Sequence, residues 1–292
     1  FGPLIAKIPA MKPMAAMLKL APSGFQKTPA IARPGVKPAT GTRQFRVAIL
    51  SGCAQSVLDP AINAATIELL TGFGVEVIVP ENEVCCGSLV HHMGREDEAH
   101  AAAIHNINIW TNELEGAGLD AIIITASGCG TTIKDYGHML RGSNNYAEKA
   151  TAVSALAKDI TEFLEMLNLP KVEQKQNLAV AYHSACSMQH GQQIKDLPKT
   201  LLQNAGFEVR DIPEGHLCCG SAGTYNIMQA EIADKLKARK ISNIEKISPD
   251  IIATGNIGCI TQIASGTNIQ ILHTVQLLNW AHGGKNPVKP RK

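Results

Sequence analysis

Short apolar runs alternate with longer amphipathic segments over most of the chain. The runs are rich in β-branched residues, and they predict strands at 45–50, 75–79, 121–125, 178–182, 208–212 and 250–254. Between them, apolar residues recur three and four positions apart, as in Ile62, Ala65 and Leu69, which indicates helices. Strands that alternate with helices imply right-handed crossovers, so we expect an α/β fold with mainly parallel sheets.

Two of the expected helices follow the first two strands. One is expected to begin at Asp59-Pro60, since a capping side chain followed by proline is typical of a helix start. A longer one is expected over about 92–114. Helices of the second half are indicated by Ile194, Leu197, Leu201 and Leu202, and then by Ile232, Leu236, Ile241 and Ile244.

The cysteines repeat with these elements and divide the chain into two similar halves. Three cysteines of the first half recur 133 positions later, and a closing cysteine recurs 130 positions later. The first quartet is Cys53, Cys85, Cys86 and Cys129. The second quartet is Cys186, Cys218, Cys219 and Cys259. We therefore expect two tandem pseudo-repeated units, each with a mainly parallel sheet and flanking helices.

The repeat also suggests domain boundaries. We expect a first cysteine-rich domain at 45–172 and a second at 173–282. Residues 1–44 are interpreted as a docking segment followed by a linker rich in proline, glycine and threonine, and 283–292 as a flexible basic tail. The chain begins with Phe1, which suggests that a further N-terminal part precedes it.

Each cysteine of a quartet comes just after a predicted strand or in the loop that follows it. The carboxyl ends of parallel strands meet at one edge of a sheet, where ligands bind in open α/β folds. This placement predicts two sites, one in each half, each with four thiols gathered at the carboxyl edge of its sheet.

Composition excludes several functions. The formal charge of +2 is close to balanced, which argues against a nucleic-acid partner. No run of eighteen apolar residues and no signal peptide is visible, so we expect a cytoplasmic protein, peripheral at most on the inner membrane. The glycine fingerprint of dinucleotide-binding enzymes is missing after the first strand.

Four kinds of chemistry compete for the eight cysteines. Disulfides belong mainly to oxidising compartments, and adjacent cysteines pair poorly with each other. Structural zinc sites usually contain Cys-x-x-Cys pairs, and this sequence has none. A nucleophilic Cys186 with His183 or His190 as its base would use one cysteine, not eight. Iron–sulfur binding fits best, because several thiolates gathered in loops suit a soft multinuclear site.

Glycines flank the cysteines in both halves. Gly87 and Gly220 follow the cysteine pairs, and Gly128 and Gly258 precede the closing cysteines. A glycine lets the backbone approach a bulky cluster closely, so these four are candidate cofactor-binding residues. The alternative is that they only serve turns.

Long strings around the cysteines resemble a known family. They are SGCAQ at 51–55, TASGCG at 125–130, LCCGSAGTY at 217–225 and GNIGC at 255–259. They resemble the C-terminal, cysteine-rich (CCG) part of the glycolate oxidase iron–sulfur subunit, over roughly four-fifths of the chain, and are related to the cysteine-rich domains of heterodisulfide reductase.

The resemblance implies an iron–sulfur electron-transfer subunit of a flavin-dependent 2-hydroxy acid oxidase, glycolate first. It implies a 4Fe–4S cluster, one or two per chain, a partner subunit that carries FAD, a quinone or other membrane acceptor, and a ferredoxin-like module missing from this sequence. The rival functions are a heterodisulfide reductase-type thiol/disulfide subunit and a non-redox zinc scaffold.

The sequence departs from the heterodisulfide reductase pattern at one point. There a fifth cysteine follows the closing one, whereas Thr132 and Gln262 occupy these positions here. Each half therefore offers four cysteines, which suffice for an ordinary 4Fe–4S cluster and put a noncubane cluster in doubt. A histidine could complete a site, and the candidates are His138, His183, His190 and His216.

Overall fold

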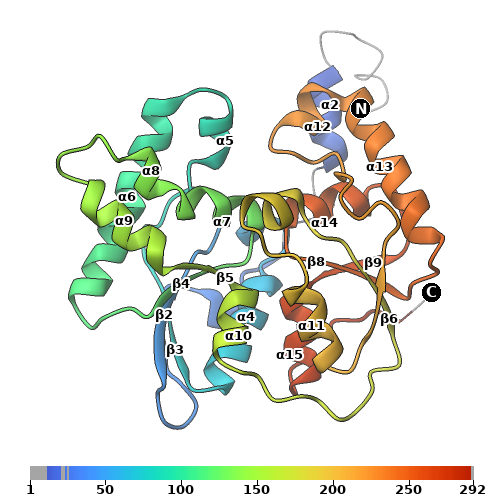
Figure 1. The fold of residues 1–292 in the computed structure, drawn as a ribbon, viewed down its shortest axis with the longest axis horizontal. Helices are drawn as coiled ribbons and strands as arrows, with labels where there is room; N and C mark the ends of the chain where they lie inside the picture. The colour runs from blue at the N-terminus through green and yellow to red at the C-terminus, as the bar shows by residue number, and fades with distance from the viewer. Residues whose placement is uncertain (1–11, 21–23, 25, 291–292) are drawn as a thin grey trace.

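The computed structural model describes residues 12–20, 24 and 26–290, which form two α/β lobes side by side (Figure 1). The first sheet has the order β1-β3-β2-β4-β5. Its strands are β1 (Gly35–Lys37), β2 (Phe45–Ile49), β3 (Val75–Val79), β4 (Ala121–Ile124) and β5 (Ala157–Asp159). All neighbours pair in parallel except β1, which is antiparallel to β3.

The second sheet has four parallel strands in the order β7-β6-β8-β9. They are β6 (Ala179–Tyr182), β7 (Glu208–Asp211), β8 (Ile251–Thr254) and β9 (Gln270–His273). This order matches β3-β2-β4-β5 of the first sheet strand for strand. The expected α/β class and the two pseudo-repeated, mainly parallel units are confirmed, and the six expected strands are all present.

The helices also correspond between the lobes. The first lobe contains α3 (Gln55–Leu58), α4 (Ala61–Gly72), α5 (Ser88–His92), α6 (Glu96–Glu115), α7 (Ser127–Lys134), α8 (Tyr136–Met139), α9 (Ala147–Leu156) and α10 (Ile160–Met166). The second contains α11 (Leu197–Asn204), α12 (Tyr225–Met228), α13 (Ala230–Glu245), α14 (Ile257–Ala264) and α15 (Thr274–Ala281). A short π-helical turn, Ser187–Gly191, precedes α11.

Two helix starts differ from expectation. The single helix expected over about 92–114 is two helices, α5 and α6, because Gly94 adopts a left-handed conformation (φ 74°) between them. The helix expected at Asp59-Pro60 begins one residue later, at Ala61, whose amide donates to Asp59 Oδ1 over 3.2 Å. Ile194, expected in a helix, lies before α11, and Ile232 on α13 is exposed.

The two lobes share a hydrophobic core. Val47 and Ile49 of β2 point into it from the first sheet, and Val180 and Tyr182 of β6 point into it from the second. Helices α4, α10, α11 and α15 fill the space between the sheets (Figure 1). Alternate residues such as Ala48 and Ala181 face a separate outer core in each lobe. Burial on both faces explains why these strands are almost entirely apolar, with Arg46 of β2 the one charged residue in them.

Parts of the expected linker and tail are ordered against the lobes. Within the linker, Ala30–Ala32 forms a 3-10 turn and Gly35–Lys37 forms strand β1 at the edge of the first sheet. Upstream, α2 (Lys12–Leu20) lies against α12 and α13 (Figure 1). In the tail, the side chain of Gln270 donates to Pro287 O and accepts from Lys289 N. Residues 1–11 and 291–292 of these segments lie outside the described residues.

Candidate metal centre

Each quartet is assembled by three consecutive strand–loop junctions. In the first lobe, Cys53 follows β2, Cys85 and Cys86 lie between β3 and α5, and Cys129 lies in the first turn of α7 after β4. The second lobe repeats the arrangement after β6, β7 and β8, with Cys259 in the first turn of α14. The structure therefore brings together the four cysteines of each half at the carboxyl edge of its sheet.

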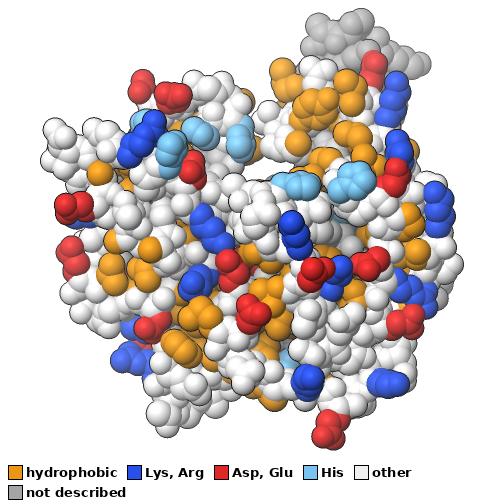
Figure 2. Space-filling model, in the orientation of Figure 1, with side chains coloured by type: hydrophobic (Ala, Val, Ile, Leu, Met, Phe, Trp, Pro, Cys, Tyr) orange, Lys and Arg blue, Asp and Glu red, His pale blue; other side chains and the backbone are white. Residues whose placement is uncertain are grey.

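Both quartets line the same cavity. All eight cysteines are among the residues that surround a space of about 520 Å³. Leu89 and His92 line it from the first lobe, and Ala222 and Gly223 from the second. The molecular outline is notched between α5 and α12 (Figure 2). Sequence reasoning led to one site in each half, but it did not show that the two sites would face one another across a common space.

The thiols of each quartet are in mutual contact. All eight cysteines are free. Cys53 Sγ lies 3.5 Å from Cys85 Sγ, and Cys219 Sγ lies 3.3 Å from Cys259 Sγ. Both separations exceed the roughly 2.05 Å of a disulfide bond. The first quartet is the more open of the two, since Cys53 is exposed whereas Cys219 and Cys259 are both buried.

Hydrogen bonds between neighbouring thiols raise the pKa of one cysteine and lower the pKa of the other. The pKa of Cys85 is lowered chiefly by a hydrogen bond from Cys53, whose own pKa is raised by the same contact. Cys186 and Cys218 form the equivalent pair in the second quartet. One thiol of each pair is thus poised to be a thiolate, which is the form that binds metals. Deprotonated sulfur gathered beside a cavity is a donor set that suits an iron–sulfur group.

The four candidate glycines divide into two kinds. Gly128 and Gly258 line the cavity. Gly87 and Gly220 are not among its lining residues in the described part of the chain. Both adopt left-handed backbone (φ 82° and 90°), and a Cβ there would meet the backbone of Ala99 or Ala233. The following long helix, α6 or α13, therefore requires glycine at these two positions.

A polar network joins the two lobes beside the cavity. Ser127, at the start of α7, is fully buried, and its amide donates to Gly255 O over 3.2 Å. Asn256 Nδ2 donates to Ser127 Oγ over 2.8 Å, while Asn256 Oδ1 caps α14 by accepting from Gly258 N. Because α7 carries Cys129 and α14 carries Cys259, these contacts set the position of one quartet relative to the other.

His273 makes a further link between the lobes. Its Nδ1 accepts from Val275 N at the start of α15, and its Nε2 lies 2.7 Å from Thr125 O at the end of β4. The first contact requires an unprotonated Nδ1, so Nε2 carries the proton and donates to Thr125 O. Burial lowers the pKa of His273 to about 4, which keeps the ring in this neutral form.

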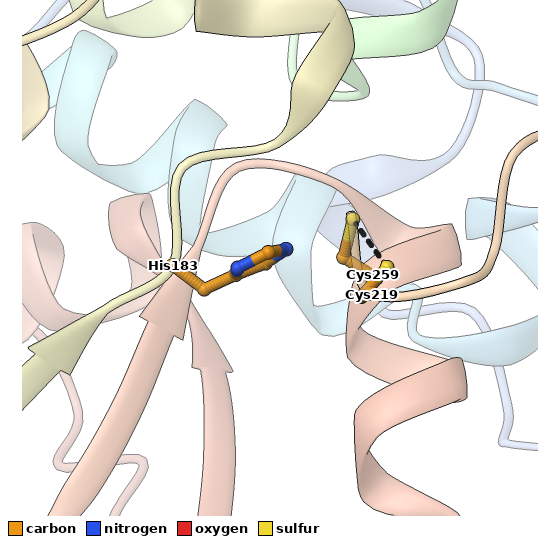
Figure 3. Close-up of side chains that lie close together, drawn as sticks. All are labelled: His183, Cys219 and Cys259. Atoms are coloured by element: carbon orange, nitrogen blue, oxygen red, sulfur yellow. Dashed lines mark hydrogen bonds between the residues drawn. The ribbon is translucent and has the colours of Figure 1, made fainter. Parts of the chain in front are cut away.

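Of the four histidines considered as additional ligands, His183 comes close to two cysteines. It follows β6, and its ring points toward Cys219 and Cys259 (Figure 3). One ring nitrogen and the two sulfurs form a group whose ligand atoms lie within 4.8 Å of one another. No such group includes His138, His190 or His216 among the described residues.

Sequence reasoning missed two titratable groups near the quartets. Lys240 on α13 is fully buried, and its Nζ donates to Glu214 O over 3.0 Å. Burial lowers its pKa, while Cys219, Cys186 and Cys218 act in the opposite direction, so the second quartet lies within electrostatic range. Near the first quartet, Glu83 accepts from Ser51 N, and burial raises its pKa to about 8. Neither residue stands out in sequence, because charged residues are common on helices and in loops.

The family model of the cysteine-rich domain, CCG, matches this chain twice, at residues 47–134 and 180–264. The chain belongs to the CCG cysteine-rich domain family. Both matches contain one complete quartet and the strands that present it. Each lobe thus contains one CCG repeat.

Curated relatives extend the likeness beyond the repeats. The chain is 40% identical over 81% of its length to the glycolate oxidase iron-sulfur subunit of Escherichia coli. It is 29% identical over 87% of its length to the probable glycolate oxidase iron-sulfur subunit of Bacillus subtilis. It spans 58% of the length of each of these relatives. It also covers 99% of lactate utilization protein A of Anoxybacillus flavithermus at 29% identity.

The fold is also found among solved structures. A hypothetical protein from Helicobacter pylori superposes with a TM-score of 0.56 at 11% identity, over 97% of this chain and 56% of that one. At this identity the likeness shows a shared fold alone. Within the described residues of the chain, no helix is both long and apolar enough to cross a bilayer.

Proposed function

We propose that this protein is an iron–sulfur electron-transfer subunit of a flavin-dependent 2-hydroxy acid oxidase complex. The observation that carries the proposal is the convergence of eight free cysteines on one cavity in two equivalent quartets. The names of the relatives from E. coli and B. subtilis support the iron–sulfur assignment and point to glycolate as the substrate of the complex.

The eight cysteines would hold the cofactor, as one or two 4Fe–4S clusters with four thiolates each. A cluster bound there supplies one-electron transfer. The chain's own contribution is to shield it and to set its charge environment. Cys86, Cys219 and Cys259 are buried, which limits access of water to the metal, and buried Lys240 places positive charge near the second quartet.

Substrate oxidation would take place on a partner subunit that carries FAD, and this chain would take electrons from that flavin. We propose a quinone or another membrane acceptor as their destination, with the complex in the cytoplasm or peripheral on the inner membrane. The chain needs no substrate pocket of its own for this role, because it only has to hold the clusters between the flavin that donates electrons and the acceptor that receives them.

A thiol/disulfide redox role is the second candidate. One observation favours it, which is that both quartets border a single cavity of about 520 Å³, within the size range of small-molecule sites. Assaying disulfide reduction by the complete complex tests this candidate, and a rate that does not depend on the second quartet eliminates it.

The test of the electron-transfer role uses the complete complex under anaerobic conditions. Glycolate is added, and the visible absorption and EPR signal of the clusters are followed over time. We expect the clusters to be reduced after the flavin, and we expect no reduction with acetate, which lacks the hydroxyl group. Reduction of the flavin with the clusters left oxidised would refute the role.

A Cys218→Ser variant tests whether electrons pass through the second quartet. Cys218 belongs to the second quartet, and its loss is expected to abolish cluster reduction there while the flavin subunit still oxidises substrate with an artificial dye. Unchanged cluster reduction in this variant would show that electrons do not pass through the second quartet.

A further inference from the structure

The two quartets differ in the side chain three positions before the first cysteine of each. His183 lies three positions before Cys186, and its amide donates to Ala253 O over 2.8 Å, which extends the pairing of β6 with β8. The side chain is 1% exposed and points toward the second quartet (Figure 3). The equivalent position in the first half, 133 residues earlier, is Leu50, which packs in the outer core of the first lobe.

The imidazole of His183 is buried, and among the described residues its one contact with a polar side chain is with the thiol of Cys259. Neither Nδ1 nor Nε2 makes a hydrogen bond of normal geometry with any described residue. A buried polar atom that lacks a hydrogen bond destabilises the folded state, and one thiol contact can satisfy only one ring nitrogen, so the ring calls for a further partner. By contrast His273, the other fully buried histidine, bonds through both of its ring nitrogens.

The surroundings of the ring identify that partner. A ring nitrogen and the sulfurs of Cys219 and Cys259 lie within 4.8 Å of one another. Two thiolates and an imidazole at this spacing can bind the same metal atom or two atoms of one cluster. The ring is therefore positioned to be a ligand, whereas Leu50 at the equivalent position has no donor atom.

We propose that His183 supplies a nitrogen ligand to the metal centre of the second quartet, whereas the first quartet binds through sulfur alone. This inference rests on the proposed function, since it takes the centre to be an iron–sulfur cluster. It makes the two halves chemically unequal despite their common fold. The second centre would have four sulfurs and one nitrogen available, although Gln262 replaces the fifth cysteine of the heterodisulfide reductase pattern.

The test is pulsed EPR on the full chain with its clusters reduced and its ten histidines labelled with ¹⁵N. We expect a hyperfine coupling of the size found for directly bound imidazole nitrogen. The coupling should disappear in His183→Leu, which installs the residue of the first half. His92→Gln is the matched control, because His92 also lines the cavity but lies on α5 in the first lobe. The coupling should be unchanged in that variant.

His183→Gln provides a second variant if leucine prevents folding, since its amide retains a polar group of similar length. Clusters that show no ¹⁵N coupling in the unsubstituted protein, or a coupling that persists in both His183 variants, would overturn the inference and leave the proposed function intact. Protein without iron and sulfide would overturn both.

Discussion

The glycine after the second cysteine pair allows a sharp test of how the quartet is supported. Gly220 has φ of 90°, and a Cβ built on it would lie 2.5 Å from the carbonyl oxygen of Ala233 in α13. Real Cβ atoms do not approach oxygen this closely, so Gly220→Ala must push the Cys218-Cys219 loop away from the helix. The amide of Gly220 also donates to Cys218 Sγ over 3.3 Å, so the same movement displaces a thiol.

The expected magnitude follows from two matched glycines. Gly94 has φ of 74° and nothing within 4 Å of its Cβ position, so Gly94→Ala costs left-handed strain alone, about 1–2 kcal/mol. Gly87 has φ of 82° and a contact of 3.1 Å to Ala99 O, which adds a smaller clash. Overpacking typically costs about 1–3 kcal/mol, so we expect about 2–3 kcal/mol for Gly87→Ala and about 3–5 kcal/mol for Gly220→Ala.

The assay is thermal unfolding of the full chain followed by circular dichroism, with iron content measured on the same samples. For a chain of this size 1 kcal/mol corresponds to about 2–4 °C in Tm, so Gly220→Ala should melt roughly 10 °C below the unsubstituted protein. It should also lose iron, whereas Gly94→Ala should retain it. If Gly220→Ala is as stable as Gly94→Ala, the close approach of α13 does not constrain this loop and the reasoning is wrong.

Two further variants test the buried titratable residues His273 and Lys240. His273→Asn keeps a cap for Val275 but removes a ring whose pKa burial lowers to about 4. The lowered pKa contributes about 3 kcal/mol to the free energy of unfolding above pH 6.5, and this contribution is lost as pH falls towards 4. The free energy of unfolding, measured with urea, should therefore decrease less on acidification in the variant than in the unsubstituted protein. The same decrease in both proteins would contradict this. Lys240→Met removes a buried positive charge near the second quartet. A redox titration should show a cluster reduction potential lower by about 40 mV, or roughly 1 kcal/mol, and no change for Lys235→Met, which removes an exposed lysine. Equal potentials in Lys240→Met and the unsubstituted protein would argue against the charge effect.

Much of the fold was predictable because local pattern and topology agree. Most strands that present the cysteines are strongly apolar runs, Glu208–Asp211 being the exception, and parallel pairing then brings the following loops to one edge. The edge strand Glu208–Asp211 was expected, but the edge strands Gly35–Lys37, Ala157–Asp159 and Gln270–His273 were missed. Ala157–Asp159 is short and half polar, and Gly35–Lys37 lies in a segment rich in proline and glycine, so neither has a strand pattern of its own.

The relation between the two quartets was not predictable from the repeat. It depends on contacts between residues far apart in sequence, such as Asn256 with Ser127 and His273 with Thr125, and no local pattern signals such pairs. The glycines illustrate a different difficulty. Sequence reasoning gave Gly87 and Gly220 as candidate cofactor-binding residues, with turns as the alternative, and it did not foresee the close helix backbone that the structure places beside both.

The central claim is that the cysteine quartets hold one or two iron–sulfur clusters, and the most direct test is metal and sulfide analysis of anaerobically purified protein. The account predicts iron and sulfide in equal amounts, about four of each per occupied quartet and about eight if both are filled, with little zinc. Cys85→Ser and Cys218→Ser should each remove the share of one quartet. Stoichiometric zinc, or an iron content that neither substitution lowers, would contradict the account.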